Sequence, residues 1–196
     1  MISALALLTA ILAATAESRD VGSATTIPHY SPVNVGTLSA HSPLPQRSPP
    51  VRLIIPALHM STKVSSLGLT ATGEVQVPST ATTVGWYRWG STPGQRGAAV
   101  ILGHVDSYLG PGVFYHLDRL VPGQQIRVVL ANGESVRFRV IRIREYLKTA
   151  FPNGLVYLAA RGRWLNLVTC GGKFDRATGH YLSDIVVFTS YVSMQR

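Results

Sequence analysis

The sequence predicts an all-β dominated fold, and among all-β folds it favours a closed barrel. The composition changes at Val51, and roughly 145 residues from there carry about seven or eight short β-type runs, each bounded by turn residues. Helical periodicity is weak, and 18 Gly and 12 Pro argue against a helical bundle. Strands of this number and length form either a barrel or a sandwich, and we favour the barrel.

The predicted strands are separated by clear breaks in the chain. They cover residues 52–55, 74–77, 98–102, 125–130, 135–143, 165–169 and 185–189. Pro56, Pro78 and Gly103 end the first three, and the Asn132-Gly133 dipeptide predicts a hairpin between the fourth and fifth. A short helix is expected at residues 113–117, between a Gly-Pro-Gly run and Asp118.

Residues 1–20 are predicted to be an export signal or a membrane anchor. Residues 1–16 are apolar apart from Ser3, Thr9 and Thr15, and Ala14-Thr15-Ala16 fits the small-residue rule for signal cleavage. A helix of this length falls short of a bilayer core, so a buried N-terminal helix is the alternative. As a signal or an anchor, the segment would make the protein membrane-associated with its folded part outside the cytoplasm, or else secreted.

Residues 21–50 are predicted to be a linker. They contain six prolines, many Ser and Thr, and a single charge, Arg47. This composition buries too little apolar surface to offset the entropy lost on ordering, and proline keeps the chain extended and semi-stiff. The linker would hold the folded part, residues 51–196, away from a surface.

The net charge of +9 does not predict a nucleic-acid-binding protein. The 15 arginines are spread along the chain, and no nucleic-acid-binding motif is present. In the densest group, Arg137 and Arg139 alternate with Phe138 and Val140, as in a strand with one polar face. A diffuse basic surface equally suits an anionic bilayer or an anionic cell wall.

Cys170 is the most informative residue. It is the only cysteine, which excludes an internal disulfide and a Cys-rich zinc site. It ends an apolar strand, and Gly171 and Gly172 follow, so a substrate chain could approach a rigidly held thiol. An exported protein keeps an unpaired thiol that is either used or buried. A nucleophile and a buried structural cysteine both remain possible here.

His104 is the candidate partner of that thiol. It also follows an apolar strand and a glycine, 66 positions before Cys170 (170 − 104). An imidazole within reach can activate a thiol or protonate a leaving amine. The alternative is an ordinary loop histidine, and five others compete with it: His29, His41, His59, His116 and His180.

Acyl chemistry also needs groups that stabilise an oxyanion. Gly171 and Gly172 offer backbone N–H donors, and with Thr169 they are the predicted substrate-binding residues. Lys173 and Arg176 are the nearby cations, and Arg176 is favoured because its guanidinium has a fixed fork of donors and stays charged. The alternative for Arg176 is a surface charge paired with Asp175.

Together these residues resemble a sortase over about residues 51–192. The resemblance rests on LGHVD around His104, on LNLVTCGG containing Cys170, and on FDRATGHY beginning at Phe174. The Gly-Gly and Phe-Asp elements, with the GPGVFY run beginning at Gly110, most resemble class F sortases. The resemblance implies that residues 51–196 are a catalytic domain, an eight-stranded β-barrel with one or two short helices.

The resemblance also implies a function. Sortases are cysteine transpeptidases that cleave a Leu-Pro-x-Thr-Gly-like sorting signal between Thr and Gly through a thioester, with hydrolysis as a side reaction. The acceptor is an amine of a cell-wall precursor or a pilin. Cys170 then matches the nucleophile and His104 the general acid/base. The expected partners are surface proteins that bear sorting signals and the membrane, through the N-terminal segment. We expect a monomer, with no cofactor and no nucleic acid.

The sequence departs from the family at the arginine. In many sortases it opens the last strand, whereas here that stretch reads HYLSD. Arg176 is the only arginine between Cys170 and Arg196, so the oxyanion role is assigned to it.

Two other functions remain open. One is a non-catalytic, basic, wall-associated β-domain in which Cys170 is merely packed. The other is an exported cysteine enzyme such as an L,D-transpeptidase, which usually carries Ser-His-Gly-Cys, whereas Leu-Val-Thr precedes the thiol here. The acidic residues are isolated along the chain, so no metal site is predicted.

Overall fold

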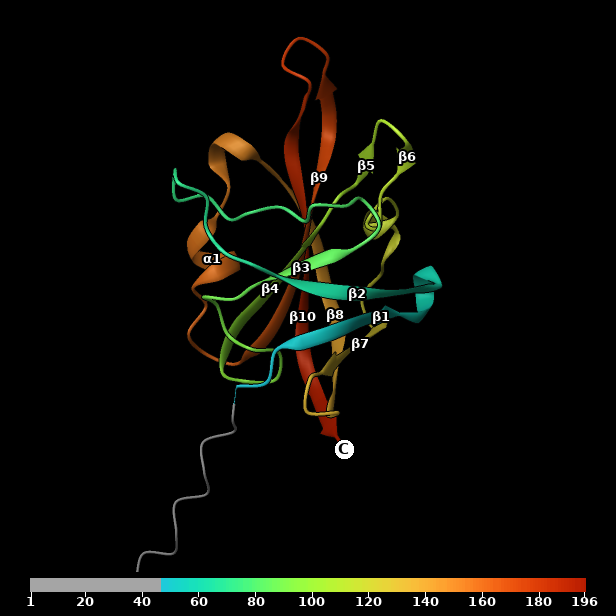
Figure 1. Cartoon of the computed structure of the whole chain (residues 1–196), viewed down its shortest axis with the longest axis vertical. Helices are drawn as coiled ribbons and strands as arrows, with labels where there is room; N and C mark the ends of the chain where they lie inside the picture. The colour runs from blue at the N-terminus through green and yellow to red at the C-terminus, as the bar shows by residue number, and fades with distance from the viewer. Residues whose placement is uncertain (1–46) are drawn as a thin grey trace, which may run out of the picture. The chain divides into compact units, whose positions relative to one another are not determined.

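The chain folds into a closed barrel of eight strands (Figure 1). The computed structural model describes residues 47–196. The barrel strands are β1 (Pro50–Ile55), β2 (Met60–Leu67), β3 (Val84–Tyr87), β4 (Gly97–Gly103), β7 (Gln125–Leu130), β8 (Ser135–Leu147), β9 (Arg163–Asp175) and β10 (His180–Gln195). Their order around the barrel is β1-β2-β3-β4-β9-β10-β8-β7, and β7 pairs back onto β1. The predicted barrel is confirmed, and the sandwich alternative is wrong.

Helices are few and short in the described part, as expected. They are the α-helix α1 (Asn153–Tyr157) and the 3₁₀ helices η1 (Pro56–Leu58), η2 (Leu117–Arg119) and η3 (Lys148–Ala150). The helix expected at 113–117 is instead a series of turns that leads into η2. A small two-stranded sheet, β5 (Asp106–Ser107) with β6 (Gly110–Pro111), follows β4.

Six of the seven predicted runs lie within strands, and the prediction for 74–77 is wrong. That segment makes only an isolated bridge between Leu69 and Val75. Strands β2 and β3 were not predicted, because β2 is rich in Ser and Thr and β3 has four residues, including Gly85. A Cβ on Gly85 would lie 2.4 Å from the Leu67 side chain, so glycine permits the close β2–β3 approach.

The predicted Asn-Gly hairpin joins β7 to β8. Gly133 has a φ of +85°, the left-handed region that glycine adopts without steric cost. Asn132 Oδ1 accepts a hydrogen bond from the Glu134 N–H at 3.1 Å, and the Leu130 N–H donates to the Glu134 carbonyl at 2.8 Å. These bonds set the register in which Val128 faces Val136.

Side-chain alternation on β9 divides the apolar core into two clusters. Leu165 and Leu167 point into the barrel, where a large cluster includes Phe138, Ile101 and Leu53. Val168 faces outward into a second cluster that also contains Val100, Val186, Val156 and Phe188. Because side chains on a strand alternate between faces, the outer face of β9 continues from Val168 to Cys170.

The segment between β8 and β9 covers part of that outer face. Val156 of α1 and the neighbouring Phe151 and Tyr157 belong to the second cluster, and Asn166 donates to the Val156 carbonyl at 2.7 Å. Figure 1 shows α1 on the outside of the barrel beside β4, while the β9–β10 hairpin extends beyond the barrel at the end opposite the C-terminus. The covering leaves the far ends of the strands, toward this hairpin, accessible.

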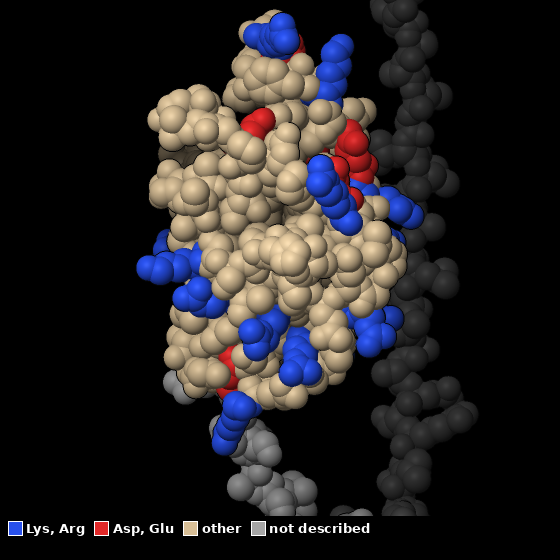
Figure 2. Space-filling view, turned by 90° about the vertical axis from the view of Figure 1, so that its right-hand side faces the viewer, with Lys and Arg blue, Asp and Glu red and all other residues tan. Residues whose placement is uncertain are grey.

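Basic side chains are scattered over the surface. Figure 2 shows separate Lys and Arg side chains with uncharged surface between them on one face of the molecule. This distribution matches the diffuse charge expected from the sequence. No helix within residues 47–196 is long and apolar enough to cross a membrane.

The predictions for residues 1–20 and for 21–46 lie outside the described residues. The described chain begins at Arg47, whose guanidinium donates to the Gly90 carbonyl at 2.5 Å. Strand β1 begins at Pro50, the last residue of the predicted linker.

Candidate functional site

Cys170 lies within strand β9, and its side chain is half-buried. Strand β9 pairs in parallel with β4 on one side and antiparallel with β10 on the other. The β4 pairing ends at Val168, two residues before Cys170, whereas the β10 pairing continues past Cys170, which lies opposite Asp184. The strand therefore fixes the backbone of Cys170, and the thiol points away from the barrel interior at the border of the second apolar cluster.

His104 lies at the end of the neighbouring strand. The parallel β4–β9 register runs from Gly97 opposite Arg163 to Leu102 opposite Val168. Two residues further along each strand are His104 and Cys170. Leu102 and Val168 both belong to the outer cluster, so alternation places Cys170 on that outer face, while His104 directly follows the end of β4 at Gly103. The fold thus brings His104 to the end of the strand next to β9, although no hydrogen bond joins the ring to the sulfur. The expectation that Cys170 ends its strand is wrong, because β9 continues to Asp175.

The His104 ring is oriented by a backbone carbonyl. Its Nε2 lies 2.7 Å from the Pro78 oxygen, which can only accept, so Nε2 carries the proton in this contact. In the neutral ring Nδ1 is then the free acceptor. The backbone beside it is also held, because the Phe114 N–H donates to the His104 carbonyl at 2.9 Å.

Gly112 permits this arrangement, and we expect Gly112→Ala to displace His104. A Cβ at position 112 would lie 2.4 Å from the His104 carbonyl oxygen, a backbone atom that cannot swing aside. The Phe114–His104 bond should break, and Cys170-dependent turnover should fall at least about tenfold, since small misplacements of catalytic groups are costly. The measurement compares the rate of the Cys170-dependent reaction in Gly112→Ala with the rate in Gly154→Ala. A Cβ at position 154 would meet nothing within 4 Å. Equal turnover of the two variants would contradict the prediction.

The structure adds two charged residues that the sequence did not point to. Lys148, in η3, places Nζ 3.5 Å from Cys170 Sγ and 3.9 Å from Asp184 Oδ1. Asp184 lies directly opposite Cys170 in the β9–β10 register. The side chains of Lys148 and Asp184 are 39% and 21% exposed, so neither charge is fully solvated. No sequence signal connects these positions, since 22 residues separate Lys148 from Cys170.

Burial and charge act in opposite directions on the thiol. Burial raises the pKa of Cys170, and the Asp184 carboxylate raises it further, while the Lys148 ammonium lowers it. Burial also raises the pKa of Asp184, and Lys148 opposes that shift. The net result is a thiol whose pKa is above its ordinary value, so it is mostly protonated at neutral pH.

Arg176 lies in the turn between β9 and β10, away from the sulfur. It is exposed, and no hydrogen bond or ion pair of residues 47–196 involves its guanidinium. Asp175, its expected alternative partner, accepts bonds from the Ala177 N–H and the Thr178 hydroxyl instead, and these bonds lower its pKa. At about 3.3 Å per residue, five strand residues place the Cα of Asp175 roughly 16 Å from that of Cys170. The structure does not bring Arg176 to Cys170, and its role stays a prediction.

The sortase domain family matches residues 53–192 of the chain. The chain belongs to the sortase family. Among solved structures, this sortase is similar to sortase C1 from Streptococcus agalactiae, with 20% identity and a TM-score of 0.56 over 72% of this chain and 66% of that one. It is also similar to sortase A from Corynebacterium diphtheriae, with 17% identity and a TM-score of 0.55 over 74% and 62%.

Sortase C-1 from Actinomyces oris shows the same likeness, with 21% identity and a TM-score of 0.54 over 72% of this chain and 73% of that one. At these identities the similarity establishes the fold. This sortase spans about two thirds of the length of the first of these structures, 66% of it. The comparison with curated proteins finds no match.

The residues that flank Cys170 in this sortase face different ways. Thr169 is 3% exposed and lies on the barrel side of β9, and its hydroxyl has no hydrogen-bond partner within the described part. Gly171 packs against Ile185, and a Cβ at position 171 would lie 2.6 Å from the Ile185 side chain. Gly172 has a φ of +72°, and a Cβ there would meet Glu145 and Ser183. The three therefore shape the strand at the thiol, and substrate binding by them stays a prediction.

Tyr181 connects the loop after β4 to the β9–β10 hairpin of the sortase. Its hydroxyl donates to Asp106 Oδ2 at 2.5 Å, and its ring meets Phe174 edge-on at 5.1 Å between centroids. The bond to Asp106 is the main reason that the pKa of Tyr181 is raised to about 12. Since Asp106 is two residues beyond His104, this bond joins the His104 loop to the β9–β10 hairpin. Tyr181 was not predicted from the sequence, since nothing in its own segment marks it as a site residue.

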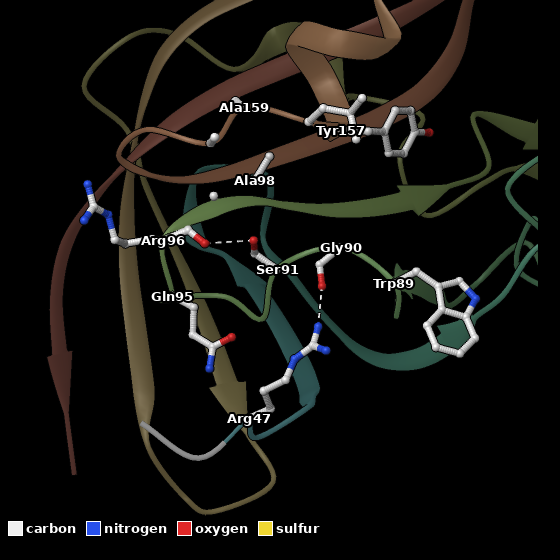
Figure 3. A pocket seen from close by; sticks show the side chains of 12 residues that line it. Arg47, Trp89, Gly90, Ser91, Gln95, Arg96, Ala98, Tyr157 and Ala159 are labelled. Atoms are coloured by element: carbon white, nitrogen blue, oxygen red, sulfur yellow. Dashed lines mark hydrogen bonds between the residues drawn. The ribbon is translucent and has the colours of Figure 1, made fainter. Parts of the chain in front are cut away.

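A separate pocket of about 490 Å³ lies at the beginning of β4 (Figure 3). Trp89, Arg96 and Tyr157 line it, and Arg47 reaches across to Gly90. Because Gly97 and Gly103 are the two ends of β4, this pocket is a strand length away from His104. It contains none of the predicted site residues. Within the described residues no group of three or more His, Cys, Asp or Glu side chains could hold a metal ion.

Proposed function

We propose that this sortase is an extracytoplasmic cysteine transpeptidase that acts on a Leu-Pro-x-Thr-Gly-like sorting signal. The observation that supports the proposal is the parallel β4–β9 register, which runs to Leu102 opposite Val168, two residues before His104 and Cys170. The membership of the sortase family supports the same reaction class. The GPGVFY and FDRATGHY elements support class F as the subclass.

In the first half-reaction His104 Nδ1 takes the thiol proton, and the thiolate attacks the carbonyl carbon of the signal's Thr–Gly bond. A C–S bond forms, and the carbonyl electron pair moves onto oxygen. When the oxyanion collapses, the C–N bond breaks and the His104 imidazolium protonates the leaving amine. A thioester on Cys170 remains.

In the second half-reaction an acceptor amine attacks the thioester. His104 takes a proton from that amine, the C–S bond breaks, and the proton returns to the departing sulfur. Water in place of the amine gives hydrolysis as the side reaction. The proposed donors are surface proteins that bear the signal, and the proposed acceptors are amines of a cell-wall precursor or a pilin.

The proposed location follows from the apolar segment at residues 1–16. It would anchor the protein in the membrane with the barrel outside, or direct its secretion. The catalytic roles proposed for Cys170 and His104, and substrate contacts by Thr169, Gly171 and Gly172, belong to the same proposal. The oxyanion role assigned to Arg176 from the sequence stays a prediction.

Trapping the thioester tests the reaction. The full chain is incubated with a library of sorting-signal peptides and no acceptor amine, and the mass added at Cys170 is read by mass spectrometry. We expect an adduct equal to the peptide up to its Thr residue. An intact library together with an unmodified Cys170 would overturn the proposal and favour the non-catalytic domain with a packed thiol.

A further inference from the structure

We propose that Lys148 is the cation that stabilises the Cys170 thiolate and then the oxyanion, with Asp184 holding it in place. This inference deepens the proposed function and rests on it for the oxyanion step. Three observations carry it: the position of Lys148, the identity of the residue opposite Cys170, and the placement of the arginines.

Lys148 is the basic side chain in contact with the reacting atom. Its Nζ is 3.5 Å from Sγ, within reach of a charge-assisted hydrogen bond to a thiolate. In a tetrahedral adduct the oxyanion is bonded to the carbon that sulfur has attacked, so it forms next to Sγ. A flexible lysine side chain with three donors can follow the negative charge from sulfur to oxygen.

The contact is built into the barrel. Strand β8 ends at Leu147, which pairs with Ser183 on β10, and the chain then turns into η3 at Lys148. Asp184, next to Ser183, faces Cys170 across the β9–β10 ladder. The three functional groups thus come from β9, from β10 and from η3, which directly follows β8.

Asp184 has a positioning role. Its carboxylate lies 3.9 Å from Nζ and holds the ammonium beside the sulfur. It also opposes ionisation of the thiol, since it raises the pKa of Cys170. Without Lys148, Asp184 and burial would act together against the thiolate. Lys148 is the charge that opposes both effects, so its loss should raise the pKa of Cys170 further.

The described arginines leave this role open. The strand position opposite Cys170 is occupied by Asp184, and Arg176 lies beyond the end of β9. Arg144 donates to the Ile143 carbonyl at 2.9 Å, and Arg142 lies over the Phe188 ring at 4.4 Å. Neither contacts the sulfur.

The step balances without any co-reactant. His104 removes the thiol proton, and Lys148 keeps all of its own protons. As the C–S bond forms, negative charge passes from sulfur to the carbonyl oxygen, and the Lys148 N–H groups donate to that oxygen. When the C–N bond breaks, the charge on oxygen disappears and Lys148 returns to the sulfur and Asp184.

Thiol alkylation tests the thiolate part without any substrate. The rate at which iodoacetamide modifies Cys170 in the full chain is measured from pH 6 to 10 for the wild type, Lys148→Gln and Lys148→Arg. Lys63→Gln is the matched control, because Lys63 is exposed on β2 and makes no contact with the site. We expect Lys148→Gln to slow alkylation at pH 7 by about tenfold and to shift the profile to higher pH, which corresponds to about one pH unit.

Lys148→Arg should restore most of the rate, since it keeps the charge, and Lys63→Gln should match the wild type. Thioester formation with a sorting peptide should fall by about 10²–10³ in Lys148→Gln, the usual cost of losing one oxyanion donor. Circular dichroism shows whether each variant keeps its fold, and the arginine variant tests the role of the charge even where the glutamine variant is destabilised.

The outcomes separate this inference from the proposed function. If no peptide acylates the wild type but Lys148→Gln still shifts the alkylation profile, the transpeptidase proposal fails and the thiolate role of Lys148 stands. An unchanged profile in Lys148→Gln would overturn the inference. So would normal thioester formation in Lys148→Gln together with a loss of two decades in Arg176→Ala, which would assign the oxyanion role to Arg176.

Discussion

Replacing Cys170 with Ala should remove all covalent acyl-enzyme and reduce transpeptidation to the background of the buffer. The thioester requires a sulfur nucleophile, and Cys170 is the only cysteine in the sequence. The measurement is the mass of the protein after incubation with a sorting peptide, together with the release of the peptide's C-terminal fragment. We expect no adduct and no fragment.

The fold should survive this change. Cys170 is half-buried, and removing one sulfur atom at the border of the outer cluster leaves the barrel interior untouched. Thermal unfolding should therefore occur within a few degrees of the wild type, in line with a change of about 1 kcal/mol or less. Residual cleavage by a folded Cys170→Ala protein would show that another group is the nucleophile.

Replacing His104 with Ala should lower thioester formation by about 10²–10⁴, the usual contribution of a positioned acid/base group. The ring is oriented by the Pro78 carbonyl with Nδ1 free, and it comes from the strand end beside Cys170. Because the raised pKa of Cys170 leaves the thiol protonated at neutral pH, loss of the base should be least harmful at high pH. The pH profile of the variant should accordingly keep rising above the neutral range.

His116→Ala is the matched control for this change. His116 is an exposed histidine that stacks edge-on with Tyr115 and lies outside the thiol site. Its removal should leave thioester formation within about twofold of the wild type, as is usual for surface substitutions. A decrease of less than tenfold in a folded His104→Ala protein would exclude general acid/base catalysis by this residue.

Local patterns predicted most of the barrel. The runs that ended at Pro56 and Gly103 and the Asn-Gly hairpin became strands and a turn, because those signals are carried by neighbouring residues, whereas the run that ended at Pro78 did not form a strand. The patterns failed at β2 and β3. Strand β2 is polar along much of its length and is stabilised by pairing with β1 and β3, and such cross-strand pairing leaves little trace in either segment alone.

The residues of the site likewise divide into those that the sequence predicted and those that only the fold brings together. The thiol and the imidazole could be selected from the sequence because each residue type is rare or chemically distinct and follows an apolar run and a glycine. Lys148, Asp184 and Tyr181 could not be selected, since each looks like an ordinary surface residue in its own segment. Only the pairing of β8, β9 and β10, with its register, brings two of them to Cys170.

The amino-acid order alone thus determined that the chain would form β-structure, and it singled out Cys170 as the predicted nucleophile and His104 as its predicted partner. The folded barrel decided which charge lies beside the sulfur. Strand and turn preferences act over a few residues, whereas the electrostatic surroundings of a side chain depend on groups that are distant in the chain and meet only when the strands pair.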